Sequence, residues 1–410
     1  MKNIFTLVCL LLSIFCITTF AKAEPIVMYV ATDPHYISPS LHDNGEVFME
    51  IINRSDGKVV HYIEEITEAF IDETIQAHPD LLLLTGDLTF KGGKNSHIDL
   101  AKKLYRIEEA GIEVLVIPGN HDLYGDRPAR FFGKEYEEAE AVDSVGFEEI
   151  YRDFGYATAL SVDKNSLSYS HMIGEEWMLL LVDVNTEFSM NTVKEETLVW
   201  VEEQLKFAKE KGYHIIGASH QNIANQSSLL TKGFTMDNAT TLQSLYEEYN
   251  VLFNMSGHVH LQHITKITDT MVDIATSSLA VNPLQYGVVT LGEKEITYNT
   301  QKVDVDRWAE KMGKPNTNDM TFSEYAEWFF KEIAFYQALY SGIDDENPEE
   351  LASYFADINA AYFAGEMDSV TIDKGLLKRW NNQVGFLPFY IDNIVTQEAN
   401  TNHTHWSRTY

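Results

Sequence analysis

The chain has 410 residues, with 30 basic and 62 acidic side chains and a formal charge of −32. A surface of that sign repels duplex nucleic acid and anionic lipid, so we expect neither as a partner. The length exceeds one ordinary hydrophobic core, which predicts a main domain and a smaller second one.

The first 23 residues have the pattern of a secretory signal peptide. Lys2 gives a positive start, Ile4 to Phe20 is an apolar run, and Ala21-Lys22-Ala23 is a cleavage site of the A-x-A type. The alternative, an uncleaved membrane anchor, requires a longer apolar span. Cleavage near Ala23 leaves a formal charge of −34. We therefore expect a secreted protein, extracellular or periplasmic, with no stable membrane insertion.

Cysteine chemistry is excluded from the mature chain. Cys9 and Cys16 are the only cysteines, and both lie in the predicted signal peptide, so no disulfide and no thiolate ligand remain after cleavage. A metal site has to use His, Asp, Glu and Asn. Those ligands suit Zn, Mn or Fe better than a soft metal or an iron–sulfur cluster.

From Ile26 onward, short apolar segments alternate with amphipathic ones. The patterns predict strands at 26–31, 80–85, 112–117, 214–218 and 251–255, and helices at 62–77, 96–110, 198–211 and 240–249. They also predict two antiparallel hairpins, 166–170 with 177–182 and 287–291 with 295–300. Strands that alternate with helices indicate sheets covered by helices. We expect a layered α/β sandwich with mixed β-sheets.

Near Val303 the composition changes to aromatic residues in helical spacing between acidic turns. The favoured interpretation is a helical domain that uses these aromatics as its own core, and the alternative is an aromatic ligand groove. We divide the chain into a signal peptide (1–23), a main domain (24–302), a helical domain (303–390) and a tail (391–410). From Glu398 the tail is expected to be loose, although His403 and His405 could hold a metal.

Polar residues recur where the predicted strands end, and such carboxyl ends meet at one rim of an α/β sheet. In chain order these are Asp33-Pro34-His35, Gly86-Asp87, Gly119-Asn120-His121-Asp122, His220 and Gly257-His258-Val259-His260. Each alone has a structural explanation, such as a helix cap or a satisfied histidine. Side chains two residues apart on extended backbone point the same way, which we expect of the D-x-H and H-x-H pairs. Five such groups in order favour a metal site.

The ordered set D-x-H, G-D, G-N-H-D, H and G-H-x-H resembles the calcineurin-like metallophosphoesterases over residues 26–302. Within that superfamily the chain is similar to secreted bacterial class III cyclic-nucleotide phosphodiesterases that carry a C-terminal helical domain. Asp43-Asn44-Gly45-Glu46, Asn185 to Asn191 and the tract from Tyr354 to Phe363 belong to this likeness.

The resemblance implies a dinuclear centre of two divalent or trivalent ions, with Mn, Fe and Zn as the candidate metals. One ion would be held by Asp33, His35 and His260, the other by Asn120, His220 and His258, with Asp87 bridging both. A carboxylate suits a bridge because it has two equivalent anionic oxygens. In one departure from the family pattern, Gln221 stands where many relatives have a second histidine. That difference bears on substrate contacts and not on metal binding.

The resemblance also implies a mechanism and a substrate class. A metal-bridging hydroxide would attack phosphorus, and His121, oriented by Asp122, would give a proton to the leaving oxygen. The expected substrate is a small phosphodiester such as a cyclic nucleotide, and the oligomeric state is left open. One alternative is an extracellular phosphomonoesterase or nucleotidase. The other is a non-catalytic protein that binds an anion or a wall polymer.

The long segment Tyr36–Lys58 starts at the first motif, before any predicted helix. Loops of this length in compact domains are usually functional, so we expect it to form one wall of the substrate pocket and the helical domain to form another. Tyr36, His42, His61 and His97 are candidates for contacts to substrate or to the ligands. A structural role for each is at least as favoured.

Overall fold

The computed structural model describes residues 24–410 except 124–126, 187–188 and 315–318. The predicted signal peptide lies outside the described residues. None of the helices in the described part of the chain combines the length and apolar character that crossing a membrane requires.

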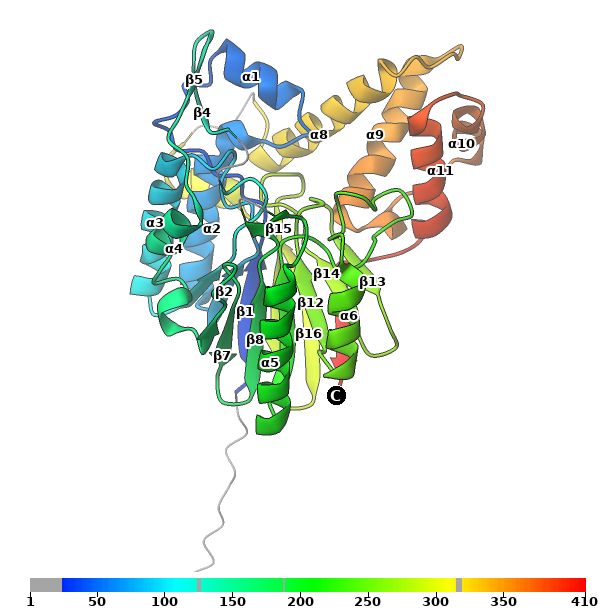
Figure 1. Ribbon diagram of the computed structural model, residues 1–410. Coiled ribbons are helices and arrows are strands. Elements are labelled where there is room, and N and C mark those ends of the chain that lie inside the picture. The colour runs from blue at the N-terminus through cyan, green and yellow to red at the C-terminus, as the bar shows by residue number, and fades with distance from the viewer. Residues whose placement is uncertain (1–23, 124–126, 187–188, 315–318) are drawn as a thin grey trace, which may run out of the picture.

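Two β-sheets form the centre of the molecule (Figure 1). One has the strand order β17 (His405–Thr409), β16 (Glu295–Lys302), β15 (Gln285–Leu291), β1 (Ile26–Ala31), β2 (Leu81–Leu84) and β3 (Glu113–Val116). The other has the order β13 (His263–Lys266), β14 (Val272–Ala275), β12 (Phe253–Ser256), β11 (His214–Ser219), β8 (Trp177–Val182), β7 (Tyr169–Ile173) and β6 (Ser161–Val162). Each sheet mixes parallel and antiparallel pairs.

Strand β8 shows how the two sheets are held together. All six of its residues are buried, because alternate side chains enter different cores. Leu179 and Leu181 share a cluster with Met28 and Val30 of β1 in the other sheet. Met178, Leu180 and Val182 instead pack against helices on the outer face. The strand is therefore apolar throughout, as expected for a sheet covered on both faces.

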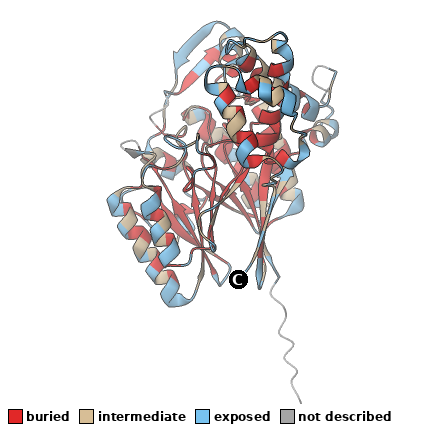
Figure 2. Cartoon of the chain, turned by 90° about the vertical axis from the view of Figure 1, so that its right-hand side faces the viewer, coloured by how far each residue is buried: buried red, intermediate tan, exposed pale blue. Residues whose placement is uncertain are grey.

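Helices cover the outer faces of both sheets. Helices α2 (Ile63–Ala77) and α3 (Lys94–Glu109) share the core of the first sheet, where Phe70 lies 5.1 Å from the ring of Tyr286. Helices α5 (Glu195–Lys211) and α6 (Ala239–Glu248) cover the second sheet. In Figure 2 the central strands are largely buried, and the helices expose their outer faces. The expected layered α/β sandwich is confirmed. The predicted hairpin of 287–291 with 295–300 forms, and the earlier hairpin forms with Tyr169–Ile173 as its first strand in place of 166–170.

The described chain also contains several smaller elements. They are α4 (Ser144–Ile150), the hairpin of β4 (Ala129–Phe132) and β5 (Glu135–Glu138), the pair β9 (Asn185–Thr186) and β10 (Ser189–Met190), and the 3-10 turns Val60–Tyr62, Tyr156–Thr158 and Met367–Ser369.

The segment Tyr36–Lys58 is not the helix-free loop that we predicted, because it contains helix α1 (Glu46–Asn53). Phe48 and Ile52 lie one turn apart on this helix and are both fully buried. The apolar face of so short a helix becomes stable only when it packs against the rest of the fold, here against Phe131 of β4.

The C-terminal region is helical, as predicted. It consists of α7 (Val305–Lys311), α8 (Phe322–Leu339), α9 (Pro348–Ala364), α10 (Lys374–Asn381) and α11 (Phe386–Glu398). The favoured interpretation of its aromatics as core is confirmed for Trp308, Phe322, Tyr325, Phe329 and others, which are buried. Trp328, Tyr336 and Tyr340 are exposed.

The loose tail predicted from Glu398 is wrong. Residues His405–Thr409 form β17, an edge strand paired antiparallel with β16. Trp406 packs 5.6 Å from Phe253, and Tyr410 lies 5.4 Å from Trp177. These aromatic contacts to distant strands order the terminus, and no local pattern in the tail reveals them.

Candidate metal centre

The fold brings the predicted ligands to the carboxyl ends of strands from both sheets. Among the described residues, two groups that could hold a metal ion gather there, each with its ligand atoms within 4.8 Å of one another. One consists of Asp33, His35, Asp87 and His260, and the other of Asp87, His220 and His258. Asp87 belongs to both groups. Asn120 joins the second, with its Oδ1 3.1 Å from Nε2 of His220.

For the D-x-H and H-x-H pairs we predicted an extended backbone, and this prediction is wrong. Five residues have φ between 46° and 69°, which is the left-handed region: Asp33, His35, Asp87, His258 and His260. Residues other than glycine rarely adopt it, and such strain gathers at functional sites. Hydrogen bonds between neighbouring strand ends hold the turns in place. For example, the N–H of Asp33 donates to the Gly86 carbonyl at 3.1 Å.

The glycines of the motifs allow the strand ends to approach closely. A Cβ on Gly119 would lie 2.1 Å from the backbone nitrogen of Asp87, and one on Gly257 would lie 1.9 Å from Oγ1 of Thr32. Neither position can hold a side chain without moving the ligand-bearing turns.

The first group leaves a carboxylate oxygen without a partner. Oδ2 of Asp33 accepts hydrogen bonds from Thr32 Oγ1 at 2.6 Å and from His258 N–H at 2.9 Å. Oδ1 of Asp33 is buried without a hydrogen bond and lies 3.3 Å from Nε2 of His260. That nitrogen lies 2.9 Å from Nε2 of His35. A bound cation would satisfy this oxygen and both nitrogens, so the donor set fits a metal of the Mn, Fe or Zn type.

In the second group, backbone carbonyls fix which imidazole nitrogens face the site. Nδ1–H of His220 donates to the Thr85 carbonyl at 2.9 Å, which leaves Nε2 as its ligand atom, 3.3 Å from Oδ1 of Asp87. Nε2–H of His258 donates to the Gly233 carbonyl at 2.7 Å and leaves Nδ1 as its ligand atom. Histidines that bind metals are commonly oriented in this way.

The electrostatics show that the buried carboxylates require positive charge. Burial alone would raise the pKa of Asp33 and Asp87, but nearby imidazoles, His220 first, lower both well below the usual range. Burial would lower the pKa of His220, but Asp87 and Asp33 raise it to about 9. The pKa of His258 falls to about 4 through burial and the charge of His220. Protons therefore take the place of cations when no metal is bound.

His121 lies at the open edge of the cluster. Its side chain is 30 % exposed, and its Nε2 lies 3.9 Å from Oδ2 of Asp87. Its backbone N–H donates to Oδ1 of Asp87 at 2.7 Å. The ring stands edge-on to that of His35, with 5.1 Å between centroids. The imidazole can therefore reach a ligand that enters from solvent.

Asp122 directly follows His121 in the chain. Its buried carboxylate accepts hydrogen bonds from the N–H groups of Gly119, Leu88 and Thr89 and from Oγ1 of Thr89. These four donors hold both oxygens of the carboxylate in place. Asp122 therefore fixes the loop that carries His121.

The four further candidates make structural contacts. Tyr36 donates from its hydroxyl to Glu64, and His42 stacks on Phe48. His61 pairs with the Tyr325 hydroxyl of α8 at 2.8 Å. His97 lies beneath the loop of His121, where Nε2–H donates to the Asp122 carbonyl at 2.9 Å.

Sequence reasoning missed Asp56, whose Oδ2 accepts a hydrogen bond of 2.6 Å from Nδ1 of His260. No motif marks it, because the two residues are 204 positions apart. It also missed the partner of Gln221, which exchanges two amide hydrogen bonds with Asn185, at 2.7 and 2.8 Å.

Comparisons with known proteins identify a relative and a solved structure with a similar fold. A relative described as "Probable cyclic nucleotide phosphodiesterase", from Vesicomyosocius okutanii subsp. Calyptogena okutanii, is 26% identical over 151 residues, which are 35% of this chain and 63% of that protein. The chain thus spans less than two thirds of the length of that relative. A dimetal phosphatase from Danio rerio has a similar fold, with a TM-score of 0.50, 11% identity, and coverage of 68% of this chain and 97% of that one.

Two family models match the chain. Residues 304–401 match the C-terminal domain of cyclic nucleotide phosphodiesterase. Residues 27–262 match the calcineurin-like phosphoesterases, and this segment contains the whole candidate metal centre. The chain belongs to the calcineurin-like phosphoesterase family.

Proposed function

We propose that this protein is a metal-dependent phosphodiesterase that hydrolyses small phosphodiesters, with cyclic nucleotides as the preferred class. The observation that carries this proposal is the pair of buried ligand groups that share Asp87, with the ring of His121 at their open edge. The match of residues 304–401 to a domain of cyclic nucleotide phosphodiesterases supports the substrate class.

The proposed ligands follow the two groups. Asp33, His35 and His260 would hold one ion, Asn120, His220 and His258 would hold the other, and Asp87 would be shared by both. When bound, two ions of Mn, Fe or Zn supply positive charge for the phosphate oxygens and activate the attacking water. The protein itself is strongly acidic, so local positive charge is needed before an anionic ester can enter.

His121 supplies the proton. Its partly exposed ring gives a proton to the leaving oxygen, which otherwise departs as an unstable alkoxide. The hydrogen bond from its backbone to Asp87 ties the position of the ring to the bridging carboxylate. A general acid of this kind commonly contributes about 10²- to 10⁴-fold to the rate. Asp122 keeps the loop of His121 in register through its four hydrogen bonds.

The test compares a diester with a monoester. Metal-free protein is restored with Mn²⁺ and assayed on bis-p-nitrophenyl phosphate and p-nitrophenyl phosphate, with His121→Ala as the variant. We expect diester turnover that is lost in the variant while metal binding remains. A preference for the monoester would instead indicate a phosphatase or nucleotidase. Two bound metals without turnover of either compound would refute the enzymatic proposal and favour anion binding.

Export and domain division are also part of the proposal. We propose that the chain is secreted after cleavage near Ala23, and that a main domain ends near residue 302, where the helical domain begins. Mass analysis of the exported protein tests the first point. Limited proteolysis tests the second, with cleavage near residue 303 as the expected result.

A further inference from the structure

The segment after α1 reaches the candidate metal centre from behind His260. Oδ2 of Asp56 accepts a hydrogen bond from Nδ1–H of His260 at 2.6 Å. The ligand atom of this imidazole is therefore Nε2, which lies 3.3 Å from Oδ1 of Asp33. On its other side, Asp56 is paired with Lys58, with Nζ 3.2 Å from Oδ1. A carboxylate behind a metal-binding imidazole fixes the tautomer and the orientation of the ring.

Helix α8 of the C-terminal region packs against this same segment. Gly57 has φ of 91°, and a Cβ at this position would lie 2.7 Å from the ring of Phe330. Phe330 is only 1 % exposed. Nε2 of Gln337, two turns further along α8, donates to the carbonyl of Ser55 at 3.4 Å. The helix therefore contacts the residues on both sides of Asp56.

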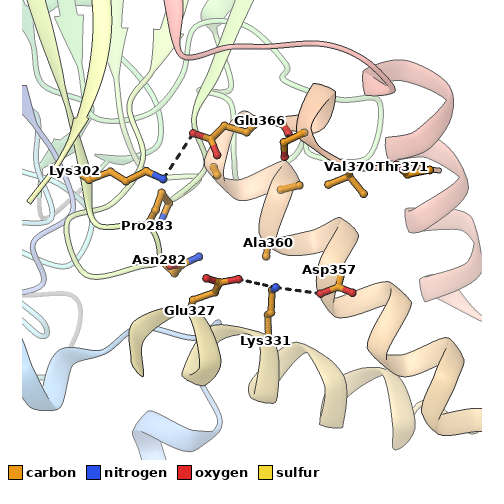
Figure 3. A pocket seen from close by; sticks show the side chains of 13 residues that line it. Asn282, Pro283, Lys302, Glu327, Lys331, Asp357, Ala360, Glu366, Val370 and Thr371 are labelled. Carbon is orange, nitrogen blue, oxygen red and sulfur yellow. Dashed lines mark hydrogen bonds and ion pairs between the residues drawn. The ribbon is translucent and has the colours of Figure 1, made fainter. Parts of the chain in front are cut away.

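Helix α8 is in turn fixed to its surroundings. Phe330 shares a buried cluster with Val281 of the main domain and Ala360 of α9. Figure 3 shows the polar cavity beside it, of about 400 Å³, in which Lys331 of α8 is paired with Glu327 and Asp357. A contact at Phe330 can therefore transmit the position of the helical region to the segment 55–58.

We propose that Asp56 is a positioning residue that holds His260 for metal binding, and that helix α8 keeps Asp56 in place. The C-terminal helices then act as a structural part of the metal centre. This inference rests on the proposed role of His260 as a ligand. The helical region then has a structural role in metal binding, which requires no direct contact between that region and the substrate.

The first experiment measures metal affinity and needs no substrate. The metal-free full chain is titrated with Co²⁺ against a chelating indicator, and the absorption spectrum of the bound ion is recorded. We expect Asp56→Ala to weaken the binding of one of the two ions by about 10- to 100-fold and to alter the absorption spectrum of that ion. Asp56→Asn should recover most of the loss, because its amide oxygen still accepts from Nδ1–H of His260.

The control and the thermal melt separate positioning from folding. Asp269→Ala removes an exposed carboxylate that is paired with Lys266, and it should leave both affinities unchanged. Melting of each metal-free variant shows whether it is folded. If folded Asp56→Ala binds two ions as the wild type does, the proposal is refuted. Wild-type protein that binds two ions but cleaves no ester would reject the proposed function and leave the positioning role intact.

The contribution of α8 needs a matched pair of variants. Phe330→Ala removes the contact to Gly57, and Phe335→Ala removes a partly buried ring from the same helix that packs toward α9–α11. We expect Phe330→Ala to weaken metal binding in the same direction as Asp56→Ala, and Phe335→Ala to lower only the melting temperature. Equal effects of the two variants on metal affinity would refute the role of α8.

Discussion

His97 allows a direct test of how the loop that carries His121 is held. The ring is fully buried beneath that loop, with Nε2–H donating to the Asp122 carbonyl and Nδ1 accepting from the Tyr151 hydroxyl at 3.0 Å. Burial lowers the pKa of His97 from 6.5 to about 4. The folded protein therefore keeps this imidazole neutral at pH values at which the unfolded chain protonates it.

The sign and size of the effect follow from these two pKa values. Because the folded pKa lies below the unfolded one, the stabilisation is complete above pH 6.5 and is lost as the pH falls toward 4. A difference of about 2.5 between the pKa values corresponds to ~3 kcal/mol of unfolding free energy at most. That is a large share of the total stability of a typical domain.

The assay is urea unfolding of the metal-free protein, followed by tryptophan fluorescence between about pH 8 and about pH 4.5. Absence of metal removes the separate effect of metal loss in acid. We expect His97→Gln to be less stable than the wild type at high pH, and the difference to shrink as the pH falls. His405→Gln, at an exposed position, serves as the control. A difference that stays constant across this range would refute the reasoning.

Three further predictions follow from the metal centre and the terminus. Binding of Mn²⁺ near pH 7 should release about two protons, which a pH indicator measures. The reason is that nearby carboxylates outweigh the effect of burial and raise the pKa of His220 and His260 to about 9. Binding of Mn²⁺ without proton release would contradict this prediction. Gly119→Ala should abolish metal binding, because the added Cβ would lie 2.1 Å from the backbone nitrogen of Asp87. The metal content of the purified variant measures this, and a normal content would show that the turn adapts. Trp406→Ala should lower the free energy of unfolding by about 2 kcal/mol in chemical denaturation, because the ring packs on Phe253. Metal affinity should not change. An unchanged free energy of unfolding would mean that β17 does not contribute to stability.

The sequence by itself determined the elements and the candidate chemistry. Strand β1 was predicted with the same bounds, and α2 within one residue, because their apolar patterns are periodic over a short stretch. The ligand residues follow strand ends, and their types and order are visible in the chain. For this reason the sequence was enough to name the carboxylates and imidazoles that the fold brings together in two groups.

The tertiary structure alone decided how those residues are held. The left-handed backbone at Asp33 and His260 depends on neighbouring strand ends, and the orientation of His258 depends on the Gly233 carbonyl. Helix α1 and strand β17 also gain their stability from packing on distant segments. Asp56 and His260, 204 residues apart, meet only because the fold places both beside the same strand ends. A single sequence records local periodicity and residue chemistry, whereas pairing between remote segments is a property of the folded chain.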